Sequence, residues 1–157
     1  MQNTATQLDA TAVEAIIDGL TQALSETVVT TMKAQNYHWN VEGMSFGPLH
    51  DMFQKLYEDH FSGQDDLAER IKALDGHALG TLAGHLERSK ITECAGDVDA
   101  PTMIGTLLAD EQMLAGTMYA LSDVAAKHGD KLTEDLAIER GRTHEKFAWM
   151  LRAHLKG

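Results

Sequence analysis

Hydrophobic side chains recur every three or four residues along four long stretches of this sequence, the spacing that marks one face of an α-helix. We expect helices at about residues 9–36, 48–75, 101–128 and 131–155, with ends uncertain by about 2–4 residues. The first stretch shows the pattern on one stripe, with Val13, Ile16, Ile17, Leu20, Leu24 and Val28. With two prolines and no run of alternating β-branched residues, the sequence predicts an all-α fold.

The connection between the second and third predicted helices, residues 76–100, is long for a helical bundle. Leu82, Leu86 and Ile91 suggest a short helix within it. Ferritin-like bundles are the four-helix bundles that need one long crossover connection. We therefore predict one ferritin-like domain over residues 1–157, a four-helix bundle with a short extra helix in the crossover.

The composition is that of an acidic globular protein, with 43% hydrophobic residues, 24 Asp and Glu against 13 Lys and Arg, and a net charge of −11. This charge disfavours a general phosphate-binding surface and suits a protein that attracts cations. Cys94 is the only cysteine, and the first basic residue is Lys33, so we expect neither an internal disulfide nor a secretory signal. No apolar run has the length of a membrane span. We expect a cytoplasmic protein without membrane association.

Two histidines and two carboxylates give the strongest chemical signal. His38 begins the stretch H-W-N-V-E-G-M-S-F-G-P-L-H and His50 ends it, while Asp65 and Glu69 stand in D-D-L-A-E-R. Asp65 and Glu69 are four positions apart, so their carboxylates share one helical face and can bind one cation together. His50 and Asp65 stand in the same predicted helix and are separated by roughly 22 Å at ~1.5 Å per residue. One ion cannot contact both within a chain, so a shared site requires two chains paired antiparallel about a two-fold axis.

Imidazole and carboxylate donors without a thiolate fit a ferrous site that is open to oxidation. Simpler interpretations stay open: Asp65 and Glu69 as a solvated helix surface, and His38 as a cap or core-edge residue after the first helix. Tyr37 and Trp39 flank His38 and could exchange single electrons with a redox metal, or could only pack at the helix end.

No glutamate in the chain is followed three residues later by histidine, whereas di-iron sites within one bundle use such pairs on two helices. The sequence therefore disfavours a conventional di-iron centre inside the bundle and again favours a site between chains. The other histidines have no ligand spacing, and we interpret them as surface or hydrogen-bonded residues: His60, His77, His85, His128, His144 and His154.

Three stretches resemble the Dps family of miniferritins, the DNA-binding proteins from starved cells: H-W-N-V-E-G-M-S-F-G-P-L-H, D-D-L-A-E-R-I and H-E-K-F-A-W-M-L. The resemblance implies a shell of twelve subunits that oxidises Fe(II), preferably with hydrogen peroxide, and stores the ferric mineral. It also implies that the ferroxidase ligands are His38 and His50 of one chain with Asp65 and Glu69 of its two-fold neighbour, in sites for up to two irons. Many members carry a further carboxylate four residues after the second histidine; here Gln54 stands there, and we assign it no ligand role.

Family members that bind DNA strongly use a mobile tail rich in Lys and Arg. Residues 1–32 contain neither, residues 1–8 are expected to form a short flexible segment, and the C-terminus offers only Arg152 and Lys156. We therefore expect no direct DNA binding. The alternative functions are a DNA-compacting protein with a secondary metal site and a bundle whose ligands hold a structural zinc ion.

Acidic residues near the start of the last helix line ion pores on three-fold axes in the family. The resemblance places Asp130, Glu134 and Asp135 at such a pore. The alternative is that they only stabilise the helix, since acidic residues in a first turn interact favourably with the helix dipole anywhere.

Overall fold

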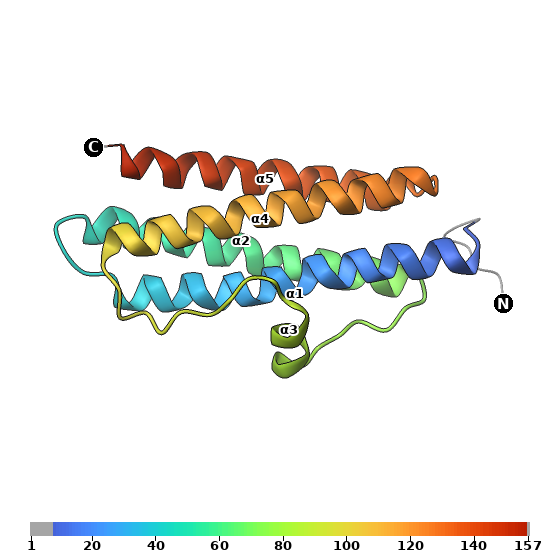
Figure 1. The fold of residues 1–157 in the computed structure, drawn as a ribbon, viewed down its shortest axis with the longest axis horizontal. Coiled ribbons are helices and arrows are strands. Elements are labelled where there is room, and N and C mark those ends of the chain that lie inside the picture. The colour runs from blue at the N-terminus through green and yellow to red at the C-terminus, as the bar shows by residue number, and fades with distance from the viewer. Residues whose placement is uncertain (1–7, 157) are drawn as a thin grey trace.

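The computed structural model describes residues 8–156, and across them every regular element is a helix (Figure 1). The long helices are α1 (Ala10–Asn40), α2 (Phe46–Ala73), α4 (Ala100–Lys127) and α5 (Lys131–Leu155), and the short helix α3 (Leu82–Arg88) lies between α2 and α4. The predicted four-helix bundle with a short helix in its crossover is confirmed. Apart from Leu8, the predicted flexible segment 1–8 lies outside the described residues.

Two helices end at other residues than the expected ones, within the stated error of about 2–4 residues. The first helix continues to Asn40 instead of ending at 36, because its buried stripe continues through Tyr37. His38 therefore lies inside α1 and not after it. The second helix spans Phe46–Ala73 instead of 48–75; it ends where Asp75 adopts a positive φ of 65° and a backbone hydrogen bond from the next residue caps the last turn.

Three of the long helices begin at an aspartate cap. Asp9, Asp99 and Asp130 each accept a hydrogen bond from the backbone N–H three residues further on, at 2.8, 2.9 and 3.1 Å respectively. Such a cap satisfies one of the unpaired amides of the first turn and typically contributes ~1 kcal/mol. These aspartates fix where α1, α4 and α5 start.

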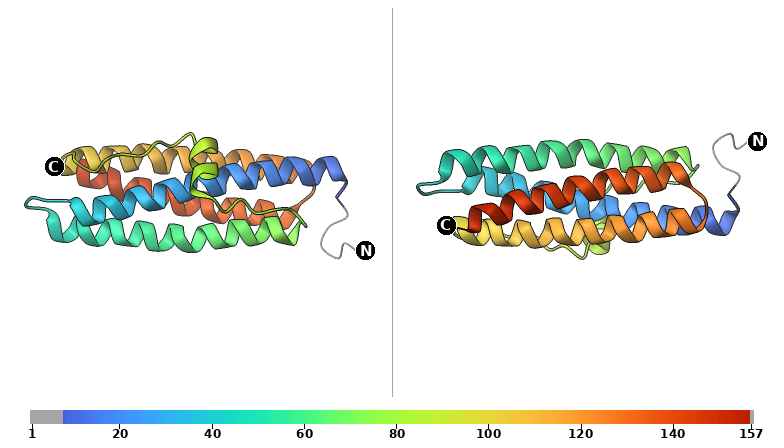
Figure 2. Two further views of the ribbon diagram at one scale, coloured as in Figure 1. Left: turned by 90° about the horizontal axis from the view of Figure 1, so that it is seen from below. Right: turned by 90° about the horizontal axis from the view of Figure 1, so that it is seen from above.

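The bundle consists of two helical hairpins, α1 with α2 and α4 with α5, which pack together mainly through α1 and α4. The crossover runs the length of the bundle and carries α3 against α1, so that α4 begins at the end opposite to the one where α2 stops (Figures 1 and 2). None of the helices within residues 8–156 has the length and apolar character needed to cross a membrane.

The interior has two apolar ends and a polar middle. One end cluster includes Tyr37, Phe53, Leu56, Leu107 and Leu151, and the other includes Ile16, Leu20, Leu67, Ile71 and Leu121. Between them along the helices lie the buried polar residues Ser25, Glu26, Thr27, Thr30, Thr31, Lys33, His60, Asp110, Glu111, Arg140 and His144. Buried polar groups need hydrogen-bond partners, so the side chains of this middle layer must bond to one another or to the backbone.

Candidate metal centre

The turn between α1 and α2 places two histidine rings against each other. His38 in the last turn of α1 and His50 near the start of α2 stack with ring centroids 3.6 Å apart and planes inclined by 16°. Nδ1 of each ring lies 2.7 Å from the main-chain oxygen of the other residue. Because a carbonyl oxygen only accepts, each Nδ1 carries a proton, and Nε2 is the nitrogen of each ring through which a metal could be bound.

Aromatic neighbours hold this pair of rings in place. Phe46 stacks on His50 at a centroid distance of 5.0 Å, and Tyr57 meets His38 edge-on at 5.2 Å. His38 is 8% exposed. A metal-binding imidazole usually has its other ring nitrogen fixed by a hydrogen bond, and both rings meet this condition in the single chain.

Asp65 and Glu69 lie further along α2, one turn apart, and both are exposed. Since α2 runs unbroken from Phe46 to Ala73, His50 and Asp65 are separated by roughly 22 Å along its axis. The structure thus brings the two histidines together and keeps the two carboxylates apart from them. The four predicted ligands thus form two separate pairs in a single chain.

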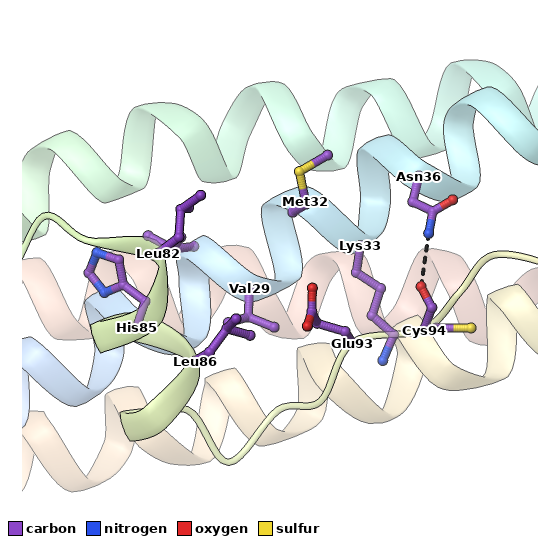
Figure 3. A pocket seen from close by; sticks show the side chains of 10 residues that line it. Val29, Met32, Lys33, Asn36, Leu82, His85, Leu86, Glu93 and Cys94 are labelled. Atoms are coloured by element: carbon purple, nitrogen blue, oxygen red, sulfur yellow. Dashed lines mark hydrogen bonds between the residues drawn. The ribbon is translucent and has the colours of Figure 1, made fainter.

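Asp65 borders an apolar surface that extends over three helices. It lines a groove with Val28 and Phe61, and beside that groove Leu82 and Leu86 of α3 lie next to Met32 of α1 around a cavity of about 220 Å³ (Figure 3). We call Val28, Met32, Phe61, Leu82 and Leu86 the apolar face. Phe61 and Leu82 are 71% and 77% exposed. Contiguous exposed apolar surface of this kind commonly marks a protein interface.

The two aromatic residues that flank His38 differ in environment. Trp39 is exposed, whereas Tyr37 is fully buried and shares a hydrogen bond of 2.8 Å with Thr106. Burial raises the pKa of Tyr37 above its usual range. Tyr37 is therefore part of the core, and Tyr57, which the sequence did not single out, is the tyrosine that contacts His38.

The three acidic residues expected at an ion pore also differ. Asp130 is buried; its carboxylate caps α5 and accepts a hydrogen bond of 2.9 Å from Arg70. Burial alone would raise the pKa of Asp130, but its hydrogen bonds to Thr133 and the charge of Arg70 hold it below the usual value. Asp130 thus has the helix-stabilising role considered as the alternative, while Glu134 is half-buried and Asp135 is exposed.

A second group of metal-ligand residues lies in the polar middle of the bundle, and the sequence analysis did not identify it. His60 of α2, Glu111 of α4 and His144 of α5 are fully buried. Glu111 accepts a hydrogen bond from Nδ1 of His144 at 2.7 Å and a short one from Nε2 of His60. One ligand atom from each residue lies within 4.8 Å of the other two.

Asp59 and Arg140 extend this network. Nδ1 of His60 donates to Asp59 at 3.0 Å, and Arg140 donates to the same carboxylate at 2.9 Å. Burial would lower the pKa of His60, but the charge of Glu111 and the bond to Asp59 raise it to about 9. Burial would raise the pKa of Glu111, but the two histidines lower it to about 2. The network is a buried imidazolium–carboxylate pair, and His144, whose pKa burial lowers, is its neutral member.

Comparison with known proteins agrees with this architecture. Residues 17–157 match the model of the ferritin-like domain. General stress protein 20U of Bacillus subtilis is 34% identical over 142 residues, covering 90% of this chain and 98% of that protein. The DNA protection during starvation protein of Brevibacillus brevis is 37% identical over 139 residues, covering 87% of this chain and 92% of that protein.

Solved structures show the same relationship. The Dps protein of Vibrio cholerae O1, described as one of a broad superfamily of ferritin-like diiron-carboxylate proteins, superposes with a TM-score of 0.92 at 30% identity, covering 99% of this chain and all of that one. A Dps protein from Bacillus brevis gives a TM-score of 0.91 at 32% identity, covering 95% of this chain and 100% of that one. The ferritin-like fold of this chain, together with these matches, means that the chain belongs to the Dps family of ferritin-like proteins. This family is known for iron storage and DNA protection.

Proposed function

We propose that this protein oxidises Fe(II) at sites shared between two-fold related chains and stores the ferric product inside a shell of twelve chains. The observation that supports the proposal is the separation along α2 between His50, which pairs with His38 of α1, and the two carboxylates. The His38–His50 pair lies at one end and the Asp65–Glu69 pair about four turns further on. An antiparallel two-fold pairing of this helix brings the histidines of one chain to the carboxylates of the other and creates two equivalent sites.

The apolar face supports this pairing. Its exposed side chains border Asp65 and continue along α1 and α3. Burying them against a second chain removes apolar area from water and stabilises the pair by about 25 cal/mol per Å² before the costs of association. The same contact places the carboxylates beside a neighbouring chain, as the shared site requires.

Within the shared site, each residue has a role set by its charge. Asp65 and Glu69 bind Fe(II) as anionic ligands, and Nε2 of His38 completes the first iron position. His50, with water, holds or steers the second iron. Gln54 donates a hydrogen bond of 2.7 Å to Glu58, which fits its having no ligand role.

Two irons in one site allow peroxide to be reduced without release of a radical. Two Fe(II) ions supply two electrons, the O–O bond of one hydrogen peroxide breaks, and two protons are taken up, which gives two Fe(III) and two water molecules. Trp39 follows His38 in the sequence and is exposed, and we propose that it donates or absorbs an electron when only one iron is bound. In this scheme the protein protects DNA by removing peroxide and Fe(II), and direct DNA binding is not required.

Rapid mixing of the metal-free protein with Fe(II), using oxygen and peroxide in separate experiments, tests the proposal. We expect fast Fe(III) absorbance with peroxide, slower absorbance with oxygen, and loss of the fast phase in Asp65→Asn. Asp66→Asn is the matched control because it removes the adjacent exposed carboxylate. Equal rates in the two variants would show that Asp65 is not an iron ligand. Zn(II) retention without any Fe(II) oxidation would favour the structural zinc site instead.

A further inference from the structure

We propose that His60, Glu111 and His144 form a second metal site, which binds one divalent transition-metal ion, Zn²⁺ in the first instance, inside each subunit. The three side chains come from α2, α4 and α5 and are fully buried. Two imidazoles and one carboxylate are a donor set that proteins use for zinc with three protein ligands. The site is independent of the proposed iron oxidation, which uses other residues.

The ligand atoms need little movement to accept an ion. Nδ1 of His144 is 2.7 Å from Glu111, and all three ligand atoms lie within 4.8 Å of one another. Tetrahedral zinc with bonds of about 2.0–2.2 Å places its donors roughly 3.3–3.5 Å apart. Glu111 and His144 must therefore separate by about 0.6–0.8 Å, and a pair at the 4.8 Å limit must approach by about 1.5 Å. The ion takes the place of the Nε2 proton of His60, which is released to solvent. The Nδ1 proton of His144 moves to the Nε2 of the same ring, so that both ligand nitrogens offer a lone pair.

Asp59 and Arg140 already provide the outer support of such a site. Asp59 accepts the Nδ1 hydrogen of His60 and is itself held by Arg140, so the Nε2 of His60 is directed at Glu111. A carboxylate that orients a histidine in this way is a recurring feature around zinc. The guanidinium of Arg140 packs over Gly63, where a Cβ would lie 2.7 Å from its Cζ. Gly63 thus makes room for this support.

The donor set and the charge favour a single ion. One carboxylate cannot bridge and neutralise two irons as the several carboxylates of a di-iron centre do. With one divalent ion in place of the Nε2 proton of His60, the network gains one positive charge, and the pair of Asp59 and Arg140 is retained. His144 is hydrogen-bonded through Nδ1 only, and its Nε2 is buried without a partner among the described residues, so this ring is the one that can adjust to an ion.

Zinc retention in a protein without the intersubunit carboxylates tests the site. The Asp65→Asn/Glu69→Gln protein is expressed with added zinc, dialysed against a chelator and analysed for metal per chain by mass spectrometry. We expect one zinc ion per chain, because a fully buried ion exchanges only when the bundle opens. Adding Glu111→Gln, which preserves the shape of the side chain, should abolish retention.

The matched control is Glu26→Gln in the same background. Glu26 is equally buried, but it contacts Gln22 and Thr117 and no histidine, so its replacement should leave one zinc per chain. Retention that is equal in the Glu111 and Glu26 variants, or no retention in the parent, overturns the proposal. Because Glu111→Gln could prevent folding, anomalous X-ray scattering at the zinc edge from crystals of the wild-type protein gives an independent readout. The peak must lie between His60, Glu111 and His144.

Discussion

His38 and His50 hold each other's rings in place, because Nδ1 of each ring donates a hydrogen bond to the main-chain oxygen of the other residue at 2.7 Å. The pair is therefore complete within one chain before any partner arrives. Replacing either ring removes a proposed iron ligand and also removes the hydrogen bond that orients the other ring. Variants of the two histidines should thus have similar and large effects on Fe(II) oxidation.

The shared site predicts complementation between two inactive variants. His50→Ala and Asp65→Asn should each be inactive alone. In a mixed two-fold pair, one site carries both changes and the other is intact. Random mixing at equal amounts should restore about a quarter of the wild-type sites, measured as the amplitude of fast Fe(II) oxidation in co-expressed oligomers. An amplitude no higher than that of either parent contradicts a site between chains.

The negative charge of the protein predicts that it does not bind duplex DNA, so that DNA migrates in a gel as it does without the protein. A net charge of −11 per chain repels phosphates, and no Lys or Arg precedes Lys33 in this sequence. We expect no shift of plasmid at about 0.1–0.2 M salt, where exposed charges are screened beyond roughly 8–10 Å. A tight complex with DNA that dissociates as the salt concentration increases would instead reveal a basic patch on the surface of the assembled protein.

Glu134 and Asp135 remain the residues that we propose to line an ion pore. Carboxylates gathered around an axis would raise the local Fe(II) concentration, an effect that weakens with ionic strength. Glu134→Gln/Asp135→Asn should slow oxidation at low Fe(II) and low salt, and match the wild-type rate at saturating Fe(II). Glu87→Gln/Asp97→Asn removes two exposed carboxylates elsewhere and should change neither rate. Unchanged kinetics in the first variant would leave these residues only a helix-stabilising role.

Asp130 should matter for stability, because one buried carboxylate both caps α5 and pairs with Arg70. Asp130→Ala loses both contacts and should lower the free energy of unfolding by about 2–4 kcal/mol. Asp130→Asn keeps the cap and loses only the charge, so its deficit should be smaller. Thermal unfolding of the assembled proteins in one buffer measures both.

The difference in melting temperature between the wild type and Asp130→Asn should decrease as the pH is lowered into the acid range. The pKa of Asp130 is lowered from 3.8 by folding, so its charge stabilises the protein fully above pH 3.8, and this contribution is lost as pH falls through the lower, folded-state pKa. The melting temperatures of the wild type and the Asn variant should therefore converge in acid. A constant difference down to acid unfolding would show that the Arg70 pair contributes nothing.

The sequence predicted the helices well because the periodicity of apolar residues is a local signal. It placed the end of α1 too early because the aliphatic stripe gives way to Tyr37 and His38, which continue the helix with aromatic rings. The separation of His50 from Asp65 also followed from the sequence, since the rise of a helix is fixed. The reciprocal hydrogen bonds of His38 and His50 could not be predicted from the sequence, because they depend on the backbone conformation of the turn between α1 and α2.

The sequence did not predict the buried network of His60, Glu111 and His144, because none of the three stands at a metal-ligand spacing from another. Each of them stands at a core position of its helix; Glu111, for example, continues the stripe of Leu107 and Leu114. Polar residues in an apolar stripe were therefore a signal within each helix. Which of them meet could not be read from spacing, because the contacts join residues 51 and 33 positions apart in the chain.

The buried polar residues in the middle of the bundle oppose displacement of α2 along its own axis. A slip of α2 along its neighbours by one turn, about 5.4 Å, would carry His60 toward the leucines of an end cluster and leave its charge without Glu111. Leaving such a charge unpaired in the interior costs several kcal/mol, so the slipped arrangement is strongly disfavoured. The same displacement would pull His50 away from His38 by a full turn. The His60–Glu111 pair thus fixes the position of α2 along the bundle. The alignment of the His38 and His50 rings at one end of the bundle therefore depends on a charge pair in its middle.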